Sequence, residues 1–138
     1  MAKQKQRELS LALQGGGAHG AYTWGVLDRL VEEKDLEISA ISATSAGAMN
    51  AVAFSAGMAE NGMQGAKDTL EALWHGISRS GRNSAPYGAL SPIVFAYASA
   101  LQSLASPYDL NPFNMNPLRD VVDDVIDFSK VDASGIKL

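Results

Sequence analysis

The sequence predicts an α/β fold built on two neighbouring parallel strands, and two turns of unusual composition indicate it. A short apolar run over residues 9–13 leads at once into three consecutive glycines, Gly15, Gly16 and Gly17, here called the triglycine loop. A second apolar run over residues 38–41 leads into a turn of small residues around Ser45. A helix is expected after each turn, and such strand–helix–strand units form parallel strands with right-handed crossovers. Because parallel strands end at the same edge of a sheet, the triglycine loop and Ser45 are expected to face one another in one cleft.

The helices are predicted from apolar residues at helical spacing. The first is expected over residues 20–32, with its apolar stripe packed on the sheet. The helix after Ser45 is expected to end near Gly57, and a turn at Asn61 and Gly62 precedes an amphipathic helix that runs to about Ser78. The apolar positions of the three helices are Ala21, Trp24, Leu27, Leu30 and Val31; Met49, Val52, Ala53 and Ala56; and Ala66, Leu70, Leu73, Trp74 and Ile77.

The second half of the chain has weaker patterns. Residues 79–88 have the composition of a loop, and residues 91–105 are apolar and rich in small side chains. Two interpretations of 91–105 stay open: a helix packed against the domain, or a lid or acyl-contacting surface beside the cleft. After an irregular connector, Asn116 and Pro117 predict the start of a helix with valines inward and acidic residues outward. Residues 129–135 are expected to be a connector, and 136–138 the beginning of a strand.

Ser45 is the candidate nucleophile, because its neighbours suit a sharp turn between a strand and a helix. Such a turn exposes a serine hydroxyl but needs small neighbours, which Ala43, Ala46 and Gly47 provide. The following helix directs its free N–H groups and its positive end toward the serine. On the opposite wall, the triglycine loop offers N–H groups that no side chains cover. The candidate oxyanion hole therefore consists of Gly15, Gly16, Gly17 and Ala46.

Three segments carry a resemblance to a known family: Gln-Gly-Gly-Gly-Ala-His-Gly over 14–20, Ile-Ser-Ala-Thr-Ser-Ala-Gly-Ala-Met-Asn-Ala over 41–51, and Asn-Pro-Phe-Asn-Met-Asn-Pro-Leu over 111–118. Together they resemble the patatin-like phospholipases, bacterial members included, over roughly residues 9–128. The resemblance implies a three-layer α/β/α fold with a mainly parallel sheet, and hydrolysis of a lipid or other ester by a Ser-Asp dyad without a cofactor. Ser45 matches the nucleophile and the triglycine loop matches the oxyanion loop. His19 stands where the family usually has Arg or Lys, and Ala43 replaces a glycine.

The acid–base partner of Ser45 is not evident in the sequence. The family's aspartate lies in an Asp-Gly pair, and these 138 residues contain none. We therefore expect residues 1–138 to be the amino-terminal part of a single catalytic domain. The remaining strands and the catalytic Asp would lie outside this chain, in a partner chain.

The other titratable residues are interpreted as structural or solvent-facing. The acidic residues Asp120, Asp123, Asp124 and Asp127 follow an outer helical face. His19 is expected to position its loop, with a role as general base as the alternative, and His75 is expected to face solvent. No His, Asp or Glu cluster has metal-ligand spacing, so no metal is expected.

Composition excludes some classes of function. The net charge of −4 and the pI near 5.0 argue against a nucleic-acid partner. The absence of cysteine rules out disulfides and is compatible with a reducing cytoplasm. Since no run reaches the ~18–20 apolar residues that span a bilayer, we expect a soluble cytoplasmic protein. A lipid substrate would still allow peripheral contact with a membrane.

Three other functions were weighed against ester hydrolysis. Gly15, Gly17 and Gly20 match the dinucleotide fingerprint G-x-G-x-x-G, but that fingerprint expects an acidic residue at the end of the second strand, where this chain has none. An acyltransferase of the malonyl-transfer type would need a histidine that the pattern does not supply. A catalytically silent interaction module is the third alternative.

Overall fold

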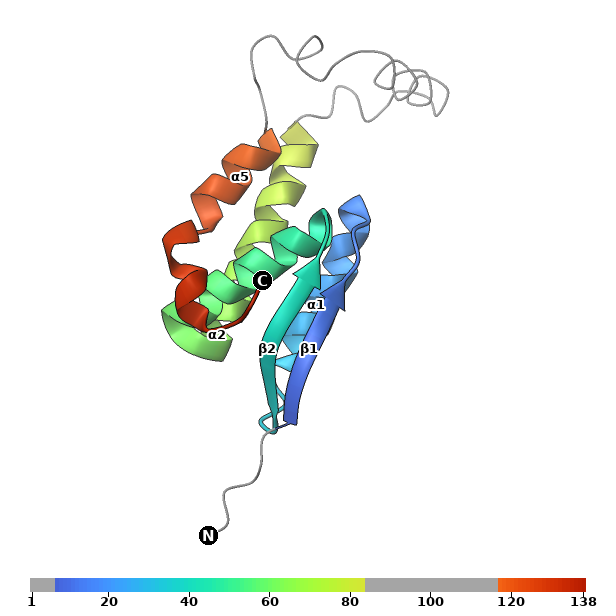
Figure 1. The fold of residues 1–138 in the computed structure, drawn as a ribbon. Coiled ribbons are helices and arrows are strands. Elements are labelled where there is room, and N and C mark those ends of the chain that lie inside the picture. The colour runs from blue at the N-terminus through green and yellow to red at the C-terminus, as the bar shows by residue number, and fades with distance from the viewer. Residues whose placement is uncertain (1–6, 84–116) are drawn as a thin grey trace.

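The computed structural model describes residues 7–83 and 117–138, and within them it confirms an α/β fold (Figure 1). The predicted segment 91–105 and the connector up to Asn116 lie outside the described residues. In chain order the elements are β1 (Arg7–Leu13), the 3-10 helix η1 (Gly17–His19), α1 (Gly20–Leu30), β2 (Leu36–Ala43), α2 (Ala46–Asn83), α5 (Pro117–Val125) and the 3-10 helices η2 (Phe128–Lys130) and η3 (Asp132–Ser134).

The two strands pair in parallel, as predicted, and each is longer than its apolar run. Leu9 pairs with Ile38, Leu11 with Ile41 and Leu13 with Ala43, with a register shift between Leu9 and Ser10. These apolar side chains pack against the core. Ser10, Ala12 and Ser42 lie on the other face and are exposed. Because Leu13 pairs with Ala43, both strands end at the same level, which sets the position of the two turns.

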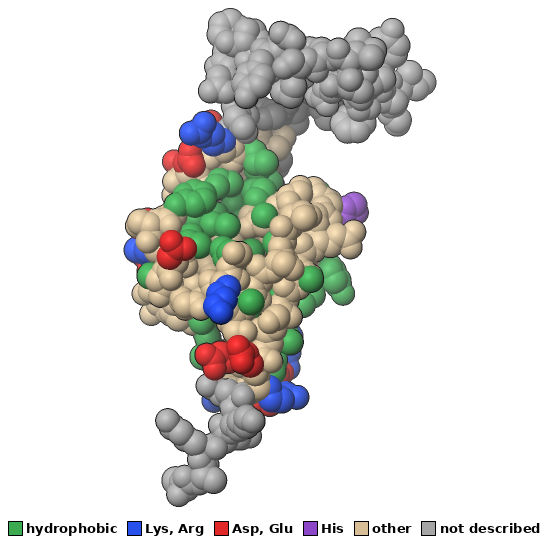
Figure 2. Space-filling view, viewed as in Figure 1, with side chains coloured by type: hydrophobic (Ala, Val, Ile, Leu, Met, Phe, Trp, Pro, Cys, Tyr) green, Lys and Arg blue, Asp and Glu red, His purple; other side chains and the backbone are tan. Residues whose placement is uncertain are grey.

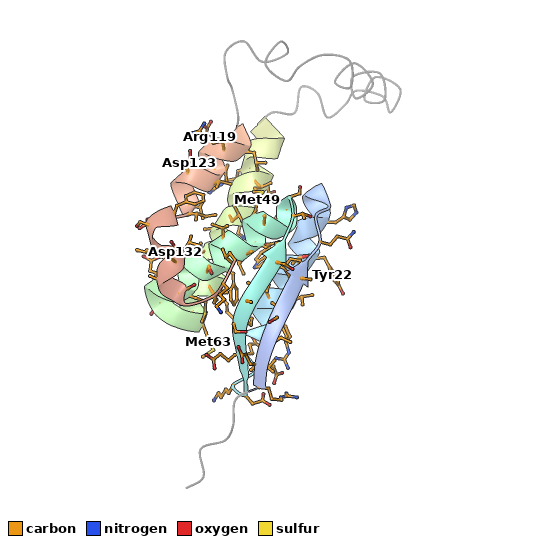
Figure 3. All side chains as sticks on the ribbon, viewed as in Figure 1. Tyr22, Met49, Met63, Arg119, Asp123 and Asp132 are labelled. Carbon is orange, nitrogen blue, oxygen red and sulfur yellow. The ribbon has the colours of Figure 1, made fainter. Side chains whose placement is uncertain are left out.

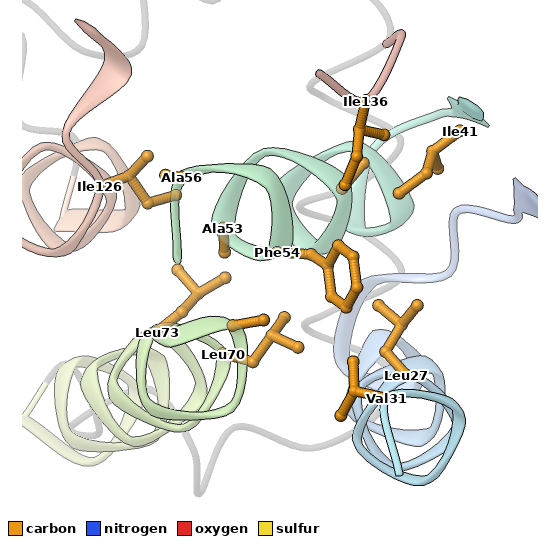
Figure 4. Packing of buried hydrophobic residues seen from close by; sticks show 12 residues of the cluster. Leu27, Val31, Ile41, Ala53, Phe54, Ala56, Leu70, Leu73, Ile126 and Ile136 are labelled. Carbon is orange, nitrogen blue, oxygen red and sulfur yellow. The ribbon is translucent and has the colours of Figure 1, made fainter. Parts of the chain in front are cut away.

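The core lies between the sheet, α1 and the two halves of α2 (Figure 4). Phe54 of α2 lies at its centre, close to Leu27 and Val31 of α1 and to Ile41 of β2. The prediction that Ala21 packs on the sheet is wrong, since Ala21 is exposed. At 3.6 residues per turn, Ala21 lies roughly 120° around the helix from Leu27. The buried positions predicted for the second half of α2, among them Leu70 and Leu73, are confirmed.

Helix α2 contains a break at Asn61 and Gly62, whose backbone angles are non-helical (φ −147° and +57°). The turn predicted there is confirmed, whereas the prediction that the helix ends at Gly57 is wrong. A Cβ atom on Gly57 would overlap the carbonyl oxygen of Gly65, so this glycine serves the close approach of the two halves. The second half continues to Asn83, so the loop predicted from residue 79 does not begin there.

The segment after α5 joins the described carboxyl-terminal residues to α2 and the sheet. Helix α5 begins at Pro117, as predicted, and packs with Val121 against Gly76 of α2. Figure 2 shows hydrophobic side chains gathered where these helices meet. Residues 129–135 form η2 and η3 rather than a plain connector. The strand predicted at 136–138 is confirmed as a parallel bridge to β2, in which Lys137 N donates to Ser39 O and Lys137 O accepts from Ile41 N.

An ion pair joins the second half of α2 to α1, and it makes a pH-dependent contribution to stability. Lys67 Nζ lies 2.8 Å from Glu32 Oε1 and 3.7 Å from Asp28 Oδ2. The hydrogen bond and charge of Lys67 lower the pKa of Glu32 below 4.5, and Glu32 raises the pKa of Lys67 above 10.5. The contribution is therefore complete between pH 4.5 and 10.5, is lost as the pH falls through the lowered pKa of Glu32, and is lost at high pH as Lys67 deprotonates.

We expect Lys67→Met to lower the free energy of unfolding at pH 7 and to have a smaller effect at pH 3, because Glu32 is then largely protonated. Urea unfolding at both pH values measures the difference. Lys34→Met, in the turn after α1, is the control. An effect of Lys67→Met that is equally large at pH 3 would contradict an ion-pair origin.

Candidate active site

The triglycine loop and the turn at Ser45 lie side by side where β1 and β2 end. Pairing continues one residue past β2, since Thr44 N donates to Leu13 O at 3.3 Å. A Cβ atom placed on Gly15 would lie 3.0 Å from Ser45 Cβ and 3.1 Å from Thr44 Oγ1. The backbone of Gly15 therefore lies directly against Ser45, so the two turns face one another as the sequence predicts.

Ser45 has the strained backbone of a sharp strand-to-helix turn. Its φ of +51° is the only positive φ of a non-glycine residue in 7–83 and 117–138. A left-handed conformation costs an L-residue about 1–2 kcal/mol, and such strain gathers at functional sites. Ser45 is exposed, whereas the next two residues, Ala46 and Gly47, are buried. The turn thus presents the serine at the surface while its small neighbours pack beneath it.

Backbone donors from two directions approach this position. At the start of α2, Gly47 N and Ala48 N donate to Thr44 O, at 2.9 and 3.3 Å. The N–H of Ala46 precedes these bonds, at the positive end of the helix. On the other side, Gly16 and Gly17 are exposed, and Gly17 has a φ of +57° that favours glycine.

His19 is bonded to its own loop. Its Nδ1 lies 3.1 Å from Gly16 O. Because a carbonyl oxygen only accepts, Nδ1 carries the proton and donates. This bond gives the ring the loop-positioning role that the sequence interpretation expected.

A buried hydrogen-bond network behind the turn was missed by sequence reasoning. Asn50 of α2 is fully buried; its Nδ2 donates to Gly20 O at 2.9 Å, and its Oδ1 accepts from Trp74 Nε1 at 2.8 Å. One signal was available, because Asn50 is the single polar side chain in the apolar run 46–54. A buried amide of this kind needs partners for both of its ends.

The acidic residues of the α5 region lie on a different surface. Asp123, Asp124 and Asp127 line a hollow with Glu60 and Lys130, and neither Ser45 nor the triglycine loop lines it. Asp127 lies beyond the end of α5, where its carboxylate accepts from Ser129 N and Oγ and its pKa is lowered by these bonds. All four acidic residues singled out in the sequence are exposed, as expected.

Other candidate roles were examined on the described residues. His75 is exposed, lies 3.5 Å from Glu71 and meets the ring of Trp24 edge-on at 6.2 Å between centroids. Within residues 7–83 and 117–138, no group of three or more His, Asp or Glu side chains is placed to hold a metal ion. In the same part of the chain, no helix has the length and apolar character needed to cross a membrane.

Comparison with known proteins adds one finding to this geometry. The family model described as patatin-like phospholipase matches residues 11–132, which is most of the chain. Neither the curated proteins nor the solved structures include a match. The matched range contains β2, the whole of α2 and the turn at Ser45, and it begins within β1. The chain therefore belongs to the patatin-like phospholipase family, a family of lipid acyl hydrolases.

Proposed function

We propose that this chain carries the nucleophile and oxyanion hole of a serine acyl hydrolase that acts on a phospholipid or another lipid ester. Family membership supports the class of reaction. The observation that carries the proposal is the contact of Gly15 with Ser45 at the shared end of β1 and β2. It brings a hydroxyl on a strained, exposed turn next to backbone donors, as acyl transfer requires.

In the proposed reaction, Ser45 Oγ attacks the ester carbonyl carbon while its proton passes to a general base. The carbonyl oxygen becomes an oxyanion, held by N–H groups of the triglycine loop and Ala46. Donors of this kind contribute about 3–4 kcal/mol each in serine hydrolases. The carbon–oxygen bond to the alcohol then breaks, and the base returns its proton to the leaving oxygen. Water, deprotonated by the same base, releases the acyl group from Ser45. No diffusible cofactor takes part.

The general base is proposed to be an aspartate outside these 138 residues. The sequence holds no Asp-Gly pair, and the acidic residues near α5 line a hollow that does not include Ser45. A partner chain or further segment that completes the catalytic domain would supply the carboxylate. The complete protein is proposed to be cytoplasmic.

A lipid substrate implies peripheral contact with a membrane or micelle. Helix α1 starts at the end of the triglycine loop, and two of its apolar side chains, Tyr22 and Val26, are exposed, by 80% and 43%. Tyr22 points away from the rest of the described chain (Figure 3). These residues support lipid contact close to the proposed site.

The dinucleotide alternative is less well supported. The fingerprint needs a carboxylate at the carboxyl end of the second strand. Strand β2 ends at Ala43, and its one acidic residue, Glu37, lies near its opposite end. The same glycines are accounted for by their contact with the turn at Ser45.

The proposal is tested by ester turnover. The protein isolated from its natural source, in the form in which the cell makes it, is compared with the 138-residue chain produced alone, on p-nitrophenyl acyl esters and phospholipid vesicles. We expect the natural form to release acid from both and the chain alone to be far slower, because it lacks the base. No turnover by the natural form would contradict the hydrolase proposal and favour a silent module. Equal turnover by both would contradict the external base. Saturable binding of NAD(H) would instead support the dinucleotide alternative.

A further inference from the structure

We infer that Asn50 is a positioning residue that holds the two halves of the proposed oxyanion hole in register, an inference that rests on the proposed function. The two halves come from different parts of the chain: the triglycine loop precedes α1, and the N–H of Ala46 opens α2. Their relative position must hold within a few tenths of an ångström if both are to donate to one oxygen. Asn50 bonds across the boundary between them.

The first half of this link is the bond from Asn50 Nδ2 to Gly20 O, 2.9 Å long and buried. Gly20 is the first residue of α1 and follows the triglycine loop by three positions. Asn50 lies on α2 five positions after Ser45. One bond therefore ties the end of the oxyanion loop to the helix that carries the nucleophile.

Close packing at the same point leaves Gly20 little room to move. A Cβ atom on Gly20 would lie 2.8 Å from Ala46 Cβ and 2.8 Å from Trp74 Cζ2. The loop end thus rests on the residue whose N–H is the second proposed donor. Packing alone resists approach, whereas the hydrogen bond from Asn50 also resists separation.

The second half of the link fixes the orientation of the Asn50 amide. Trp74 Nε1 donates to Asn50 Oδ1 at 2.8 Å, so the oxygen is committed to Trp74 and the NH₂ group is turned toward Gly20. Trp74 is 8% exposed and Asn50 0%. A buried amide with both ends satisfied is stiff, since rotating it would leave several polar groups unpaired.

The test separates positioning from plain stability by comparing substitutions at the two ends of the network. Asn50→Asp is nearly isosteric and still accepts from Trp74, but it cannot donate to Gly20 O. Asn50→Ala removes both bonds without adding charge. Trp74→Phe, the matched control, removes the bond to Oδ1 and keeps the Nδ2 donor. Each variant is made in the natural form of the protein, and kcat and KM for a p-nitrophenyl ester are measured below its unfolding temperature.

We expect both Asn50 variants to lower kcat by about 10–100-fold with KM within twofold, because the lost contact acts on the transition state. Trp74→Phe should keep kcat within about threefold, although its Tm also falls. Independently of activity, the amide of His19, which donates to Gly16 O at 3.2 Å, should exchange hydrogen faster in the Asn50 variants than in Trp74→Phe.

Each contrary outcome has a separate meaning. Absence of turnover in the unmutated natural form refutes the proposed function, whereas turnover that the folded Asn50 variants retain in full refutes the positioning role. A fall in kcat as large in Trp74→Phe as in Asn50→Asp would show a general structural role and overturn the inference. If neither Asn50 variant folds at 10 °C, Asn50 is required for the fold and the inference is likewise overturned.

Discussion

Ser45→Ala is expected to lower ester turnover by the natural form of the protein by about 10⁴-fold or more, to the background of uncatalysed hydrolysis. Removing the nucleophile of a serine hydrolase has effects of this size, because the covalent route is lost and only binding and oxyanion stabilisation remain. The measurement is kcat on a p-nitrophenyl ester, with circular dichroism to confirm folding.

A matched control lies three residues away. Ser42 is also an exposed serine, at the end of β2, where its hydroxyl is 3.5 Å from Leu11 O. Ser42→Ala is expected to keep turnover within about twofold. If Ser45→Ala retains more than a tenth of the activity, Ser45 does not form the acyl-enzyme.

The same position allows a check of backbone strain. Since a glycine adopts a φ of +51° at little cost, Ser45→Gly is expected to be inactive and yet at least as stable as the unmutated protein. This combination would indicate that the serine is kept for its chemistry and not for the turn.

Gly47→Ala is expected to cost about 1–3 kcal/mol of stability and to lower kcat by about 100-fold. A Cβ atom on Gly47 would overlap the carbonyl oxygen of Leu13, and it would lie 2.8 Å from Leu13 C and 2.9 Å from Gln14 O. These are backbone atoms at the end of β1, which cannot rotate away as a side chain can. Either the strand end or the start of α2 must shift, and both shifts separate Ser45 from the triglycine loop.

Gly25→Ala is the control for this substitution. Gly25 lies inside α1, and a Cβ atom there meets nothing within 4 Å. It should be neutral, or stabilising by about 0.5–1 kcal/mol, because alanine is the better helix former. Thermal unfolding and kcat of the two variants decide the matter. Equal activity in Gly47→Ala and Gly25→Ala would show that the contact between the turn and β1 does not hold the site together.

The sequence was sufficient to predict the arrangement around Ser45, because each step there is local. Alternating turns and apolar runs predict the two strands, and a short crossover helix makes them parallel. The parallel pairing then places the ends of both runs together, which the register of Leu13 with Ala43 confirms.

The errors concern contacts between segments distant in the sequence. Gly57 was predicted to end a helix because glycine commonly does so, whereas its function is to let the backbone at Gly65 approach. Asn50 was passed over because its partners, Gly20 and Trp74, lie 30 and 24 positions away. Neither role has a local pattern, so tertiary packing had to be known first.

The most direct test of a nucleophilic Ser45 is to incubate the natural form of the protein with a fluorophosphonate and to map the adduct by peptide mass spectrometry. We expect one adduct per chain, on Ser45, and none after Ser45→Ala. An adduct on any other residue, or no adduct in protein that hydrolyses esters, would contradict the assignment of Ser45 as the residue that attacks the ester.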